Sequence, residues 1–312
     1  MAKGKVDFLT LAQFGREELD LILDLAATLK ESWRTGRPEP RLAGRSLALI
    51  FHKPSLRTRV SFDVGMNQLG GHSLYITDAE IGFGKRESIH DIANVISRFV
   101  DGIMIRTFHQ SDVEDLARYA RVPVINGLTD SDHPCQILAD MFTLREKGVA
   151  LDGLSLAWIG DGNNVAKSWI DAALSYAIDL RLACPEGYDP DPKAIEAVKA
   201  RGRGKVTVVR RPDEAVRGAR VIYTDTWTSM GQEAEAAKRR AAFAGFQVDA
   251  KMLSKAAPDV LVMHCLPAHR GEEITDEVMD GPHSIVFDEA ENRMHLQKAI
   301  LVHCMGASRA RG

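Results

Sequence analysis

SLALIFHKPSLRTRVSFDVGMNQLGG, residues 46–71, contains the pattern that decides the fold. Its first part, Ser46–Phe51, is a short apolar run, which is typical of a buried strand. The residues Arg57–Leu69 follow a helical pattern, and Gly70-Gly71 ends it. A strand that leads directly into a helix is half of a βαβ unit, so this stretch predicts a parallel sheet.

Strands and helices alternate along the rest of the chain in the same way. In the N-terminal half the pattern predicts strands at Ser46–Phe51, Ser73–Ile76, Gly102–Thr107 and Val122–Asn126, and helices at Arg16–Trp33, Arg57–Leu69, Ser88–Phe99 and Val113–Tyr119. After a helix at Pro134–Lys147 it predicts strands at Ser155–Ile159, Leu180–Cys184, Lys205–Val209, Arg220–Thr224, Asp259–Cys265 and Ser284–Phe287. The 312 residues suit two domains at roughly 150 residues each. The predicted fold class is therefore α/β, with two doubly wound parallel-sheet domains.

Composition narrows the classes of protein. The net charge of −3 and the absence of a long basic run argue against nucleic acid or an anionic membrane as a partner. No window approaches the ~18 consecutive apolar residues of a membrane span, and the N-terminal stretch lacks the apolar core of a signal peptide. The four cysteines are widely spaced without a C-x-x-C pair, so we expect a reducing compartment, the cytoplasm, and no zinc or redox motif.

The loop between the first strand and its helix has the chemistry of a phosphate site. Ser55 is a good N-cap, and the residues after it expose backbone N–H groups that, with the helix dipole, attract an anion. Thr58 adds a hydroxyl, and Arg57 can form a forked pair with a phosphate. A capped helix with surface arginines is the alternative explanation, since short motifs of this kind also occur by chance.

Four motifs together resemble the aspartate and ornithine carbamoyltransferases. Ser55-Leu56-Arg57-Thr58-Arg59 looks like the family's carbamoyl phosphate loop, with Leu56 where threonine is usual, at a position that contributes its backbone N–H. Arg106 ends a strand in GIMIRTF. The stretch His133-Pro134-Cys135-Gln136 looks like the family's H-P-x-Q, and Glu291–His295 resembles its A-E-N-R-x-H, which contains Arg293. The resemblance implies that the carbamoyl phosphate contacts are Ser55, Leu56, Arg57, Thr58, Gly82, Arg106, His133, Gln136, Cys265, Leu266 and Arg293.

Gly82 departs from the family pattern. It lies in AEIGFGKRES, five residues before Glu87-Ser88, where the family often has a glutamine. The glutamine contact to carbamoyl phosphate, which by resemblance can cross a subunit boundary, is then missing or supplied by the backbone.

A second set of motifs points to an amino-acid site. The stretch Gly160–Val165 is a strand-to-helix turn, but a dinucleotide fingerprint would require glycine at Val165. It resembles the family's G-D-x-N-N-V, in which Asn164 contacts the α-carboxylate and amino groups of ornithine. The strand Asp259–Met263 leads into His264-Cys265-Leu266-Pro267, the family's H-C-L-P; a buried structural cysteine is the alternative explanation for Cys265, and His264 is expected to be structural.

The most discriminating motif follows the strand Arg220–Thr224. Asp225 leads into Trp227–Glu233, which contains S-M-G at Ser229-Met230-Gly231. By resemblance, S-M-G marks transferases that act on ornithine rather than on aspartate or acylated ornithine. The ammonium of ornithine needs a carboxylate, which Asp225 offers, and its carboxylate needs neutral donors such as those of the Ser229-Met230 region. Asp225 alone could also be a helix cap at a strand end.

The resemblance implies a carbamoyl transfer from carbamoyl phosphate to the δ-amine of L-ornithine, as in arginine metabolism. The implied catalytic residues are Arg106, His133, Asp225 and Cys265, and no metal or organic cofactor is needed. Residues 1–147 would bind carbamoyl phosphate, residues 148–290 would bind ornithine, and the final helix, within 291–312, would pack back on the first domain. The implied assembly is a homotrimer or an assembly of trimers.

Three alternatives remain open at this stage. They are a carbamoyltransferase for another acceptor such as putrescine or an acylated ornithine, a Rossmann-type dehydrogenase, and an inactive relative that serves as a binding protein. An acceptor panel, a test for NAD binding and an activity assay separate them. The motifs do not distinguish arginine synthesis from arginine catabolism.

Overall fold

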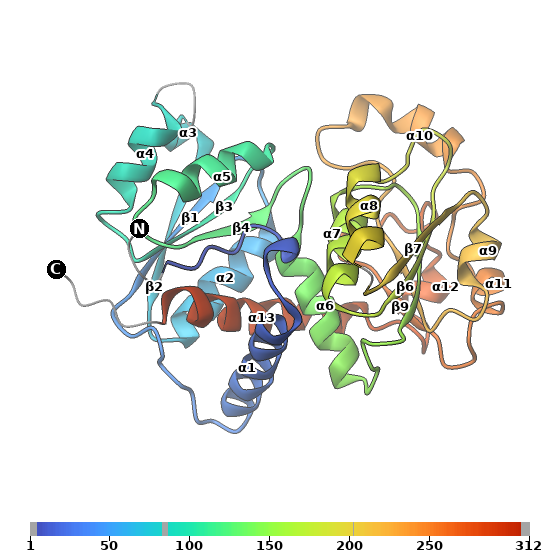
Figure 1. Ribbon diagram of the computed structural model, residues 1–312, viewed down its shortest axis with the longest axis horizontal. Helices are drawn as coiled ribbons and strands as arrows, with labels where there is room; N and C mark the ends of the chain where they lie inside the picture. Colours follow the sequence, from blue (N-terminus) through green and yellow to red (C-terminus); the bar gives the residue numbers. More distant parts are fainter. Residues whose placement is uncertain (1–4, 83–86, 202, 307–312) are drawn as a thin grey trace. The chain divides into compact units, whose positions relative to one another are not determined.

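The computed structural model describes residues 5–82, 87–201 and 203–306, and the chain divides into two compact units (Figure 1). The first unit comprises Met1–Phe142 and Asn292–Gly312, and the second comprises Thr143–Glu291. The chain passes from one unit to the other within helix α6 (Pro134–Glu146) and again within helix α13 (Val286–Met305).

The first unit is built on a parallel four-stranded sheet in the order β2-β1-β3-β4. Its strands are β1 (Ser46–Phe51), β2 (His72–Thr77), β3 (Gly102–Arg106) and β4 (Val124–Leu128). Its helices are α1 (Arg16–Arg34), α2 (Leu56–Gln68), α3 (Asp78–Ile81), α4 (Ile89–Ile96) and α5 (Gln110–Tyr119), with a 3-10 turn, η1, at Leu11–Gln13. Side chains from α4 and α5 form one core with alternate residues of β1 and β3, such as Ile50 and Ile103.

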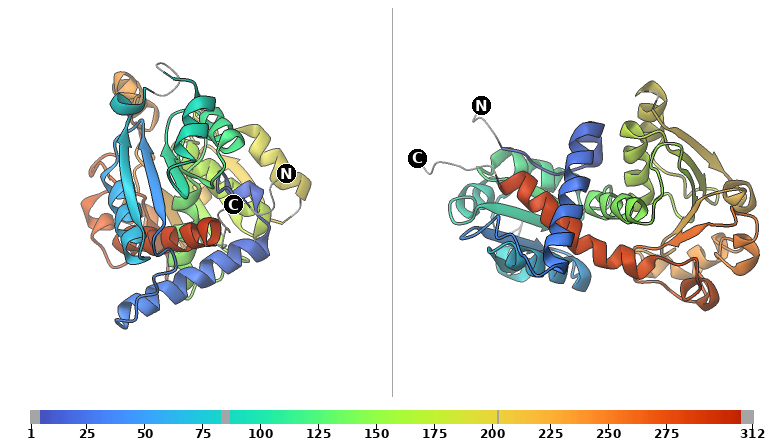
Figure 2. Two further views of the ribbon diagram at one scale, coloured as in Figure 1. Left: turned by 90° about the vertical axis from the view of Figure 1, so that its left-hand side faces the viewer. Right: turned by 90° about the horizontal axis from the view of Figure 1, so that it is seen from below.

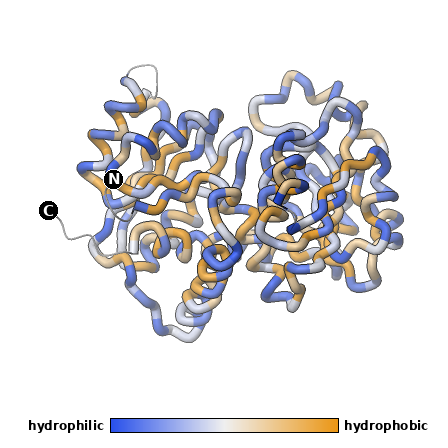
Figure 3. The backbone as a smooth tube through the Cα atoms, viewed as in Figure 1, coloured by the Kyte–Doolittle hydropathy of each residue, from blue (hydrophilic) through white to orange (hydrophobic). Residues whose placement is uncertain are grey.

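Helix α1 follows the predicted amphipathic pattern. Hydrophobic and hydrophilic residues alternate along it (Figure 3), and the buried ones are Leu19, Ile22, Leu23, Ala26 and Leu29, as the spacing predicted. The final helix packs back on the same unit, because Lys298 donates to Gln68 (2.9 Å) on α2 and Lys30 donates to Asn292 (2.7 Å). Figure 2 shows α13 crossing beside α1.

The second unit is built on a parallel five-stranded sheet in the order β7-β6-β5-β8-β9. Its strands are β5 (Ser155–Ile159), β6 (Asp179–Ala183), β7 (Lys205–Val209), β8 (Val221–Thr224) and β9 (Leu261–Met263). Its helices are α7 (Asn164–Ser175), α8 (Pro192–Arg201), α9 (Pro212–Val216), α10 (Ala236–Ala242), α11 (Ala250–Leu253) and α12 (Asp276–Met279), with a 3-10 turn, η2, at Glu233–Glu235. The α/β class with two parallel sheets is confirmed.

One predicted strand is wrong. Ser284–Phe287 is not a strand, because Ser284 makes only an isolated bridge to Val262 and helix α13 begins at Val286. A short apolar run does not by itself distinguish a strand from the buried first turn of a helix. The last helix therefore starts five residues earlier than predicted, and β9 is shorter than the predicted Asp259–Cys265.

Each sheet contains a point where the direction of the strand order reverses. The chain leaves β1 toward β2 on one side and reaches β3 and β4 on the other; it leaves β5 toward β6 and β7 on one side and reaches β8 and β9 on the other. Parallel α/β sheets bind ligands outside the carboxyl ends of the strands at such a point. The two reversals therefore indicate where to look for a site in each unit. Among the described residues, no helix is long and apolar enough to cross a membrane.

Candidate active site

The first half-site lies where β1 and β3 end, and Thr58 is its centre. Ser55 is the N-cap of α2 and accepts from the backbone N–H of Thr58 (3.4 Å). The Oγ1 of Thr58 accepts from Nη1 of Arg106 (3.3 Å) and from Nη2 of Arg293 (3.0 Å). The structure thus brings four predicted residues together at the Thr58 hydroxyl. They are Ser55 and Thr58 at the start of α2, Arg106 at the end of β3 and Arg293 on α13.

This cluster is buried and positively charged. Thr58 has no exposed surface, and the exposed fractions of Arg106 and Arg293 are 9% and 4%. Two guanidinium groups at the N-terminus of a helix make a site that favours a dianion. The buried guanidinium groups of Arg106 and Arg293 repel each other, so an anion bound between them would relieve that repulsion.

His133 belongs electrostatically to the same cluster. It precedes α6 and is buried, and its pKa is lowered well below the usual value by desolvation first and then by the charges of Arg293 and Arg106. The imidazole is therefore neutral near pH 7 and can donate one hydrogen bond. Gln136, one turn into α6, donates Nε2 to Oδ1 of Asp140 (2.8 Å), a buried carboxylate that the sequence analysis did not single out.

The other predicted residues of this half-site have different surroundings. Leu56 is 76% exposed at the first turn of α2, and Arg57 beside it is half-buried. Gly82 is the C-cap of α3 in the left-handed region, with φ of 57°, a conformation that glycine adopts more easily than glutamine. The rest of the predicted loop, residues 83–86, lies outside the described residues.

The second half-site lies where β5, β8 and β9 end. The Oδ2 of Asp225 accepts from the side-chain amide of Asn163 (2.8 Å), and its Oδ1 accepts from the backbone of Thr226 (2.8 Å) and from the Sγ of Cys265 (3.1 Å). Asp225 is buried and Cys265 is partly exposed. Asp225 and Cys265, two of the predicted catalytic residues, are therefore in direct contact.

Asn163 is a functional candidate that the sequence analysis missed. It is the N-cap of α7, and its Oδ1 accepts from the backbone of Val165 (2.9 Å) and Ala166 (3.2 Å) while its amide nitrogen holds Asp225. Asn164, the predicted ornithine contact, is the first residue of the helix. An asparagine at a helix start is a recognisable cap, but the contact with Asp225, 62 positions later, is a tertiary feature.

The S-M-G segment forms a turn after β8. Gly231 has φ of 92°, and its backbone N–H donates to both carboxylate oxygens of Glu233 (3.0 Å each). Ser229 donates its backbone N–H to Oε1 of Gln232 (3.2 Å), and Met230 is 48% exposed. The turn therefore exposes an apolar side chain near the end of the strand that carries Asp225.

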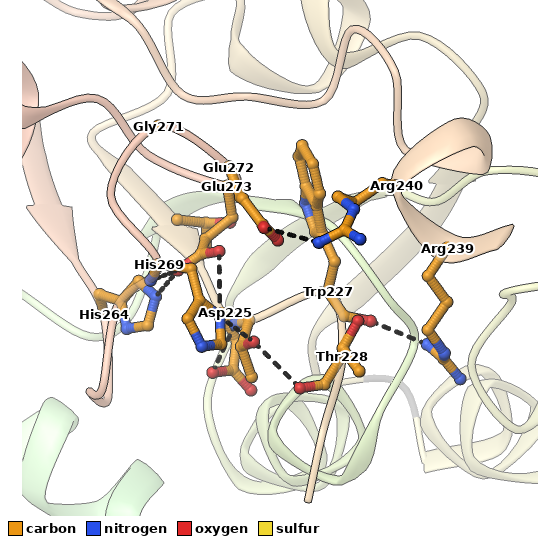
Figure 4. Close-up of polar contacts among 12 residues, drawn as sticks. Asp225, Trp227, Thr228, Arg239, Arg240, His264, His269, Gly271, Glu272 and Glu273 are labelled. Atoms are coloured by element: carbon orange, nitrogen blue, oxygen red, sulfur yellow. Dashed lines mark hydrogen bonds and ion pairs between the residues drawn. The ribbon is translucent and has the colours of Figure 1, made fainter. Parts of the chain in front are cut away.

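His264 has a structural role, as predicted. It lies among the contacts drawn in Figure 4 and has no exposed surface. The backbone N–H of Leu266 donates to its Nδ1 (2.9 Å), so the proton is on Nε2, which donates to Glu273 (3.1 Å). Leu266 has φ of 58° and precedes a cis peptide bond to Pro267. The two hydrogen bonds of the His264 ring hold the backbone on either side of Cys265.

Two groups of described residues place potential metal ligands within 4.8 Å of one another. The first group is Asp225, His264 and Cys265, and the second is His269, Glu272 and Glu273. Both nitrogens of His264 are used in hydrogen bonds inside the unit, so a metal in the first group would have to break one of them.

Comparison with known proteins places both halves in one family. Residues 6–146 match the carbamoyl-P binding domain of aspartate/ornithine carbamoyltransferases, and residues 152–304 match the family's Asp/Orn binding domain. The ornithine carbamoyltransferase of Geobacter sulfurreducens is 53% identical over 298 residues, which cover 96% of this chain and 98% of that protein.

Solved structures agree with the sequence comparison. The ornithine carbamoyltransferase of Pyrococcus furiosus superimposes with a TM-score of 0.94 at 48% identity, covering 99% of this chain and all of that one. The enzyme of Thermus thermophilus gives a TM-score of 0.87 at 44% identity, covering 96% and 98%.

Proposed function

This chain belongs to the aspartate/ornithine carbamoyltransferase family, and we propose that it transfers the carbamoyl group of carbamoyl phosphate to the δ-amine of L-ornithine, giving L-citrulline and phosphate. The observation that carries the proposal is the buried cluster in which Arg106 and Arg293 both donate to Thr58 at the N-terminus of α2. A dianionic phosphate is the ligand class that such a cluster favours.

The reaction is an acyl transfer. The δ-amine attacks the carbamoyl carbon, a tetrahedral intermediate forms, and the C–O bond to phosphate breaks. Arg106, neutral His133 and Thr58 are the donors that would polarise the carbonyl oxygen and stabilise the developing oxyanion. One donor of this kind contributes about 3–4 kcal/mol to lowering the barrier, or roughly 10²–10³ in rate.

The remaining residues of the first half-site hold the leaving group. Arg57, Arg293, Ser55 and the N-terminus of α2 would bind phosphate and stabilise its charge as the C–O bond breaks. Asp140 accepts from Nε2 of Gln136 because a carboxylate cannot donate, so the carbonyl oxygen of the amide is the atom that Gln136 can offer to the carbamoyl NH₂.

The second half-site would hold the acceptor. Asp225, whose carboxylate is oriented by Asn163 and Cys265, would pair with the ammonium groups of ornithine. The δ-amine has to lose a proton before attack, since an amine of this kind titrates at about 10 in water. Departing phosphate can take the second proton. Asn164 and the Ser229-Met230 segment are the proposed contacts of the ornithine carboxylate.

A citrulline assay with purified protein, carbamoyl phosphate and ornithine tests the proposal. We expect citrulline and phosphate in equal amounts, and a panel with putrescine, N-acetylornithine and aspartate should give at most trace product. If another member of the panel were carbamoylated in preference to ornithine, the family assignment would stand but the proposed acceptor would be wrong. No product with any acceptor would contradict catalysis altogether.

We propose that the protein acts in the cytoplasm as a homotrimer, alone or in an assembly of trimers. The four cysteines form no disulfide with one another, which suits a reducing compartment. Helix α2 carries three exposed apolar side chains on one face, Leu56, Val60 and Val64, spaced four residues apart. Such a stripe on the surface of a folded unit is suited to contact between subunits.

A further inference from the structure

Arg239, on α10, is buried although it is charged. Its exposed fraction is 6%, and its Nη1 donates both to Oδ2 of Asp161 (2.7 Å) and to the backbone oxygen of Trp227 (2.9 Å). Its Nε lies 3.4 Å from the carboxylate of Glu235, and its guanidinium lies 5.0 Å from the ring centroid of Tyr188. Buried arginines are rare unless paired, and Arg239 is paired with two carboxylates of the same unit.

Asp161, whose carboxylate accepts from Arg239, lies in a turn that is itself held in place. The backbone oxygen of Asp161 accepts from the indole of Trp158 (3.0 Å), and Gly162 donates its N–H to the backbone oxygen of Tyr188 (2.8 Å). A Cβ at Gly162 would lie 2.2 Å from the backbone nitrogen of Pro190, so the turn packs directly against that backbone and has no room for a side chain there. Asp161 is therefore a fixed anchor between β5 and α7.

Arg239 and Asp161 together form a clamp, and the segment after β8 is the element that they hold. Trp227 is buried and stacks on Phe243 (ring centroids 5.6 Å apart), and its backbone oxygen is held by Arg239 (Figure 4). The next residues are Thr228, Ser229 and Met230. Arg239 thus links the segment that carries S-M-G to the same turn whose Asn163 binds Asp225.

We propose that Arg239 is a positioning residue that fixes the Trp227–Met230 segment on the Asp161 carboxylate and so sets the affinity for the amino-acid substrate without touching it. The inference rests on the proposed function, because it takes this segment and Asp225 as the acceptor site. Burial raises the pKa of Asp161 above its ordinary value, and the hydrogen bond and charge of Arg239 offset part of that rise.

Three variants test the clamp. Arg239→Gln removes the charge, Arg239→Lys keeps it on a shorter side chain that cannot reach both oxygens as well, and Asp161→Asn removes the anchor charge. The matched control is Arg240→Gln, because Arg240 is the adjacent residue, is exposed, and pairs with Glu272 (3.2 Å) instead (Figure 4). Melting temperature is measured for every variant.

The decisive readout is the split between the two substrates. We expect Arg239→Gln to raise KM for ornithine by about 10- to 100-fold, the range that a small displacement of a substrate-holding segment can cause, with KM for carbamoyl phosphate unchanged. Arg239→Lys should recover part of the loss, and Arg240→Gln should match the parent protein. Asp161→Asn combined with Arg239→Gln should cost less than the sum of the two single changes.

Two outcomes would overturn the inference. One is an unchanged KM for ornithine in well-folded Arg239→Gln and Arg239→Lys proteins. The other is an equal rise in both KM values that follows the melting temperature, which would indicate a purely structural ion pair. Failure of the parent protein to make citrulline would instead contradict the proposed function, and binding of the non-reactive analogue norvaline would then measure the clamp without catalysis.

Discussion

The side-chain amide of Asn163 donates to Oδ2 of Asp225 across 2.8 Å, so the N-cap of α7 and the carboxyl end of β8 are joined by one hydrogen bond. The other oxygen of the carboxylate accepts from Cys265. A carboxylate that is held at both oxygens and largely buried is oriented before a substrate arrives. Such preorganisation reduces what binding costs in side-chain entropy.

Asp225→Asn should weaken ornithine binding much more than carbamoyl phosphate binding. The substitution removes the charge that pairs with ammonium, and loss of one member of a desolvated charge pair costs about 2–5 kcal/mol. The measurement is titration with a non-reactive ornithine analogue that keeps the ammonium groups, with and without carbamoyl phosphate. Asp259→Asn, an exposed carboxylate paired with Arg220, is the control. Equal analogue affinity in Asp225→Asn and the parent protein would show that the ornithine site has been misplaced.

Arg57→Ala should lose most activity through carbamoyl phosphate. Arg57 is in the first turn of α2 next to the N-cap Ser55, and water cannot replace its forked pair with a dianion. KM and kcat are measured while carbamoyl phosphate is varied, with Arg118→Ala, an exposed arginine on α5, as the control. Unchanged affinity and turnover in Arg57→Ala would remove this residue from the phosphate site.

The sequence predicted the parallel sheets because their evidence is local. Runs such as Ser155–Ile159 are apolar, short and followed by helices, and the structure has that strand with the predicted bounds. Ser284–Phe287 has the same local appearance but is followed by Asp288 and Glu289, which suit the first turn of a helix. The apolar run by itself does not show whether such a segment becomes a strand or the first turn of a helix.

The site residues likewise divide into those with local sequence signals and those brought together only by the tertiary fold. Ser55 and Thr58 could be predicted because a cap and its helix are adjacent in sequence. The bond between Asn163 and Asp225, and the clamp of Arg239 on Asp161, each join residues far apart in the chain, 62 and 78 positions respectively. The first bond depends on the register of β5 beside β8, and the second depends on where α10 packs; the sequence pattern specifies neither.

Cys265 should be the one cysteine of the four that a thiol reagent labels in the folded protein. Burial raises the pKa of Cys135 and of Cys184 to about 12 and raises the pKa of Cys304 as well, whereas Cys265 is partly exposed. A buried thiol with a raised pKa forms little thiolate and reacts slowly. Mass spectrometry of peptides after brief labelling identifies the site.

Cys265→Ser is the companion variant for this experiment. It should abolish the labelling, weaken ornithine binding and shift the pH dependence of kcat, which reports groups that ionise in the substrate complex. An ornithine analogue added after carbamoyl phosphate should protect Cys265 in the parent protein. Rapid labelling of Cys135 or Cys184 instead would contradict the burial on which the expectation depends.

His295 should make the protein less stable in acid. Burial, followed by the charges of Lys298 and Lys30, lowers its pKa from 6.5 to about 3. Between these two values the unfolded chain binds a proton that the folded chain does not, so stability is lost as the pH falls from about 6.5 toward 3. One such group contributes a slope of about 1.4 kcal/mol per pH unit.

Urea unfolding at a series of pH values measures this contribution. His295→Gln should flatten the pH dependence of the free energy of unfolding by one proton in that window. Parallel curves for His295→Gln and the parent protein would mean that His295 is protonated in the folded state.

Val60→Glu should break the proposed homotrimer. Val60 is 47% exposed between Leu56 and Val64 on α2, and a carboxylate in the centre of an apolar contact would lose its hydration without gaining a partner. We expect sedimentation to give a trimer mass for the parent protein and a smaller mass for Val60→Glu, with most activity lost. Leu21→Glu, at an exposed apolar position on α1, should keep both the mass and the activity. A parent protein that sediments as a fully active monomer would contradict both the trimer and the proposal that the stripe on α2 is a contact between subunits.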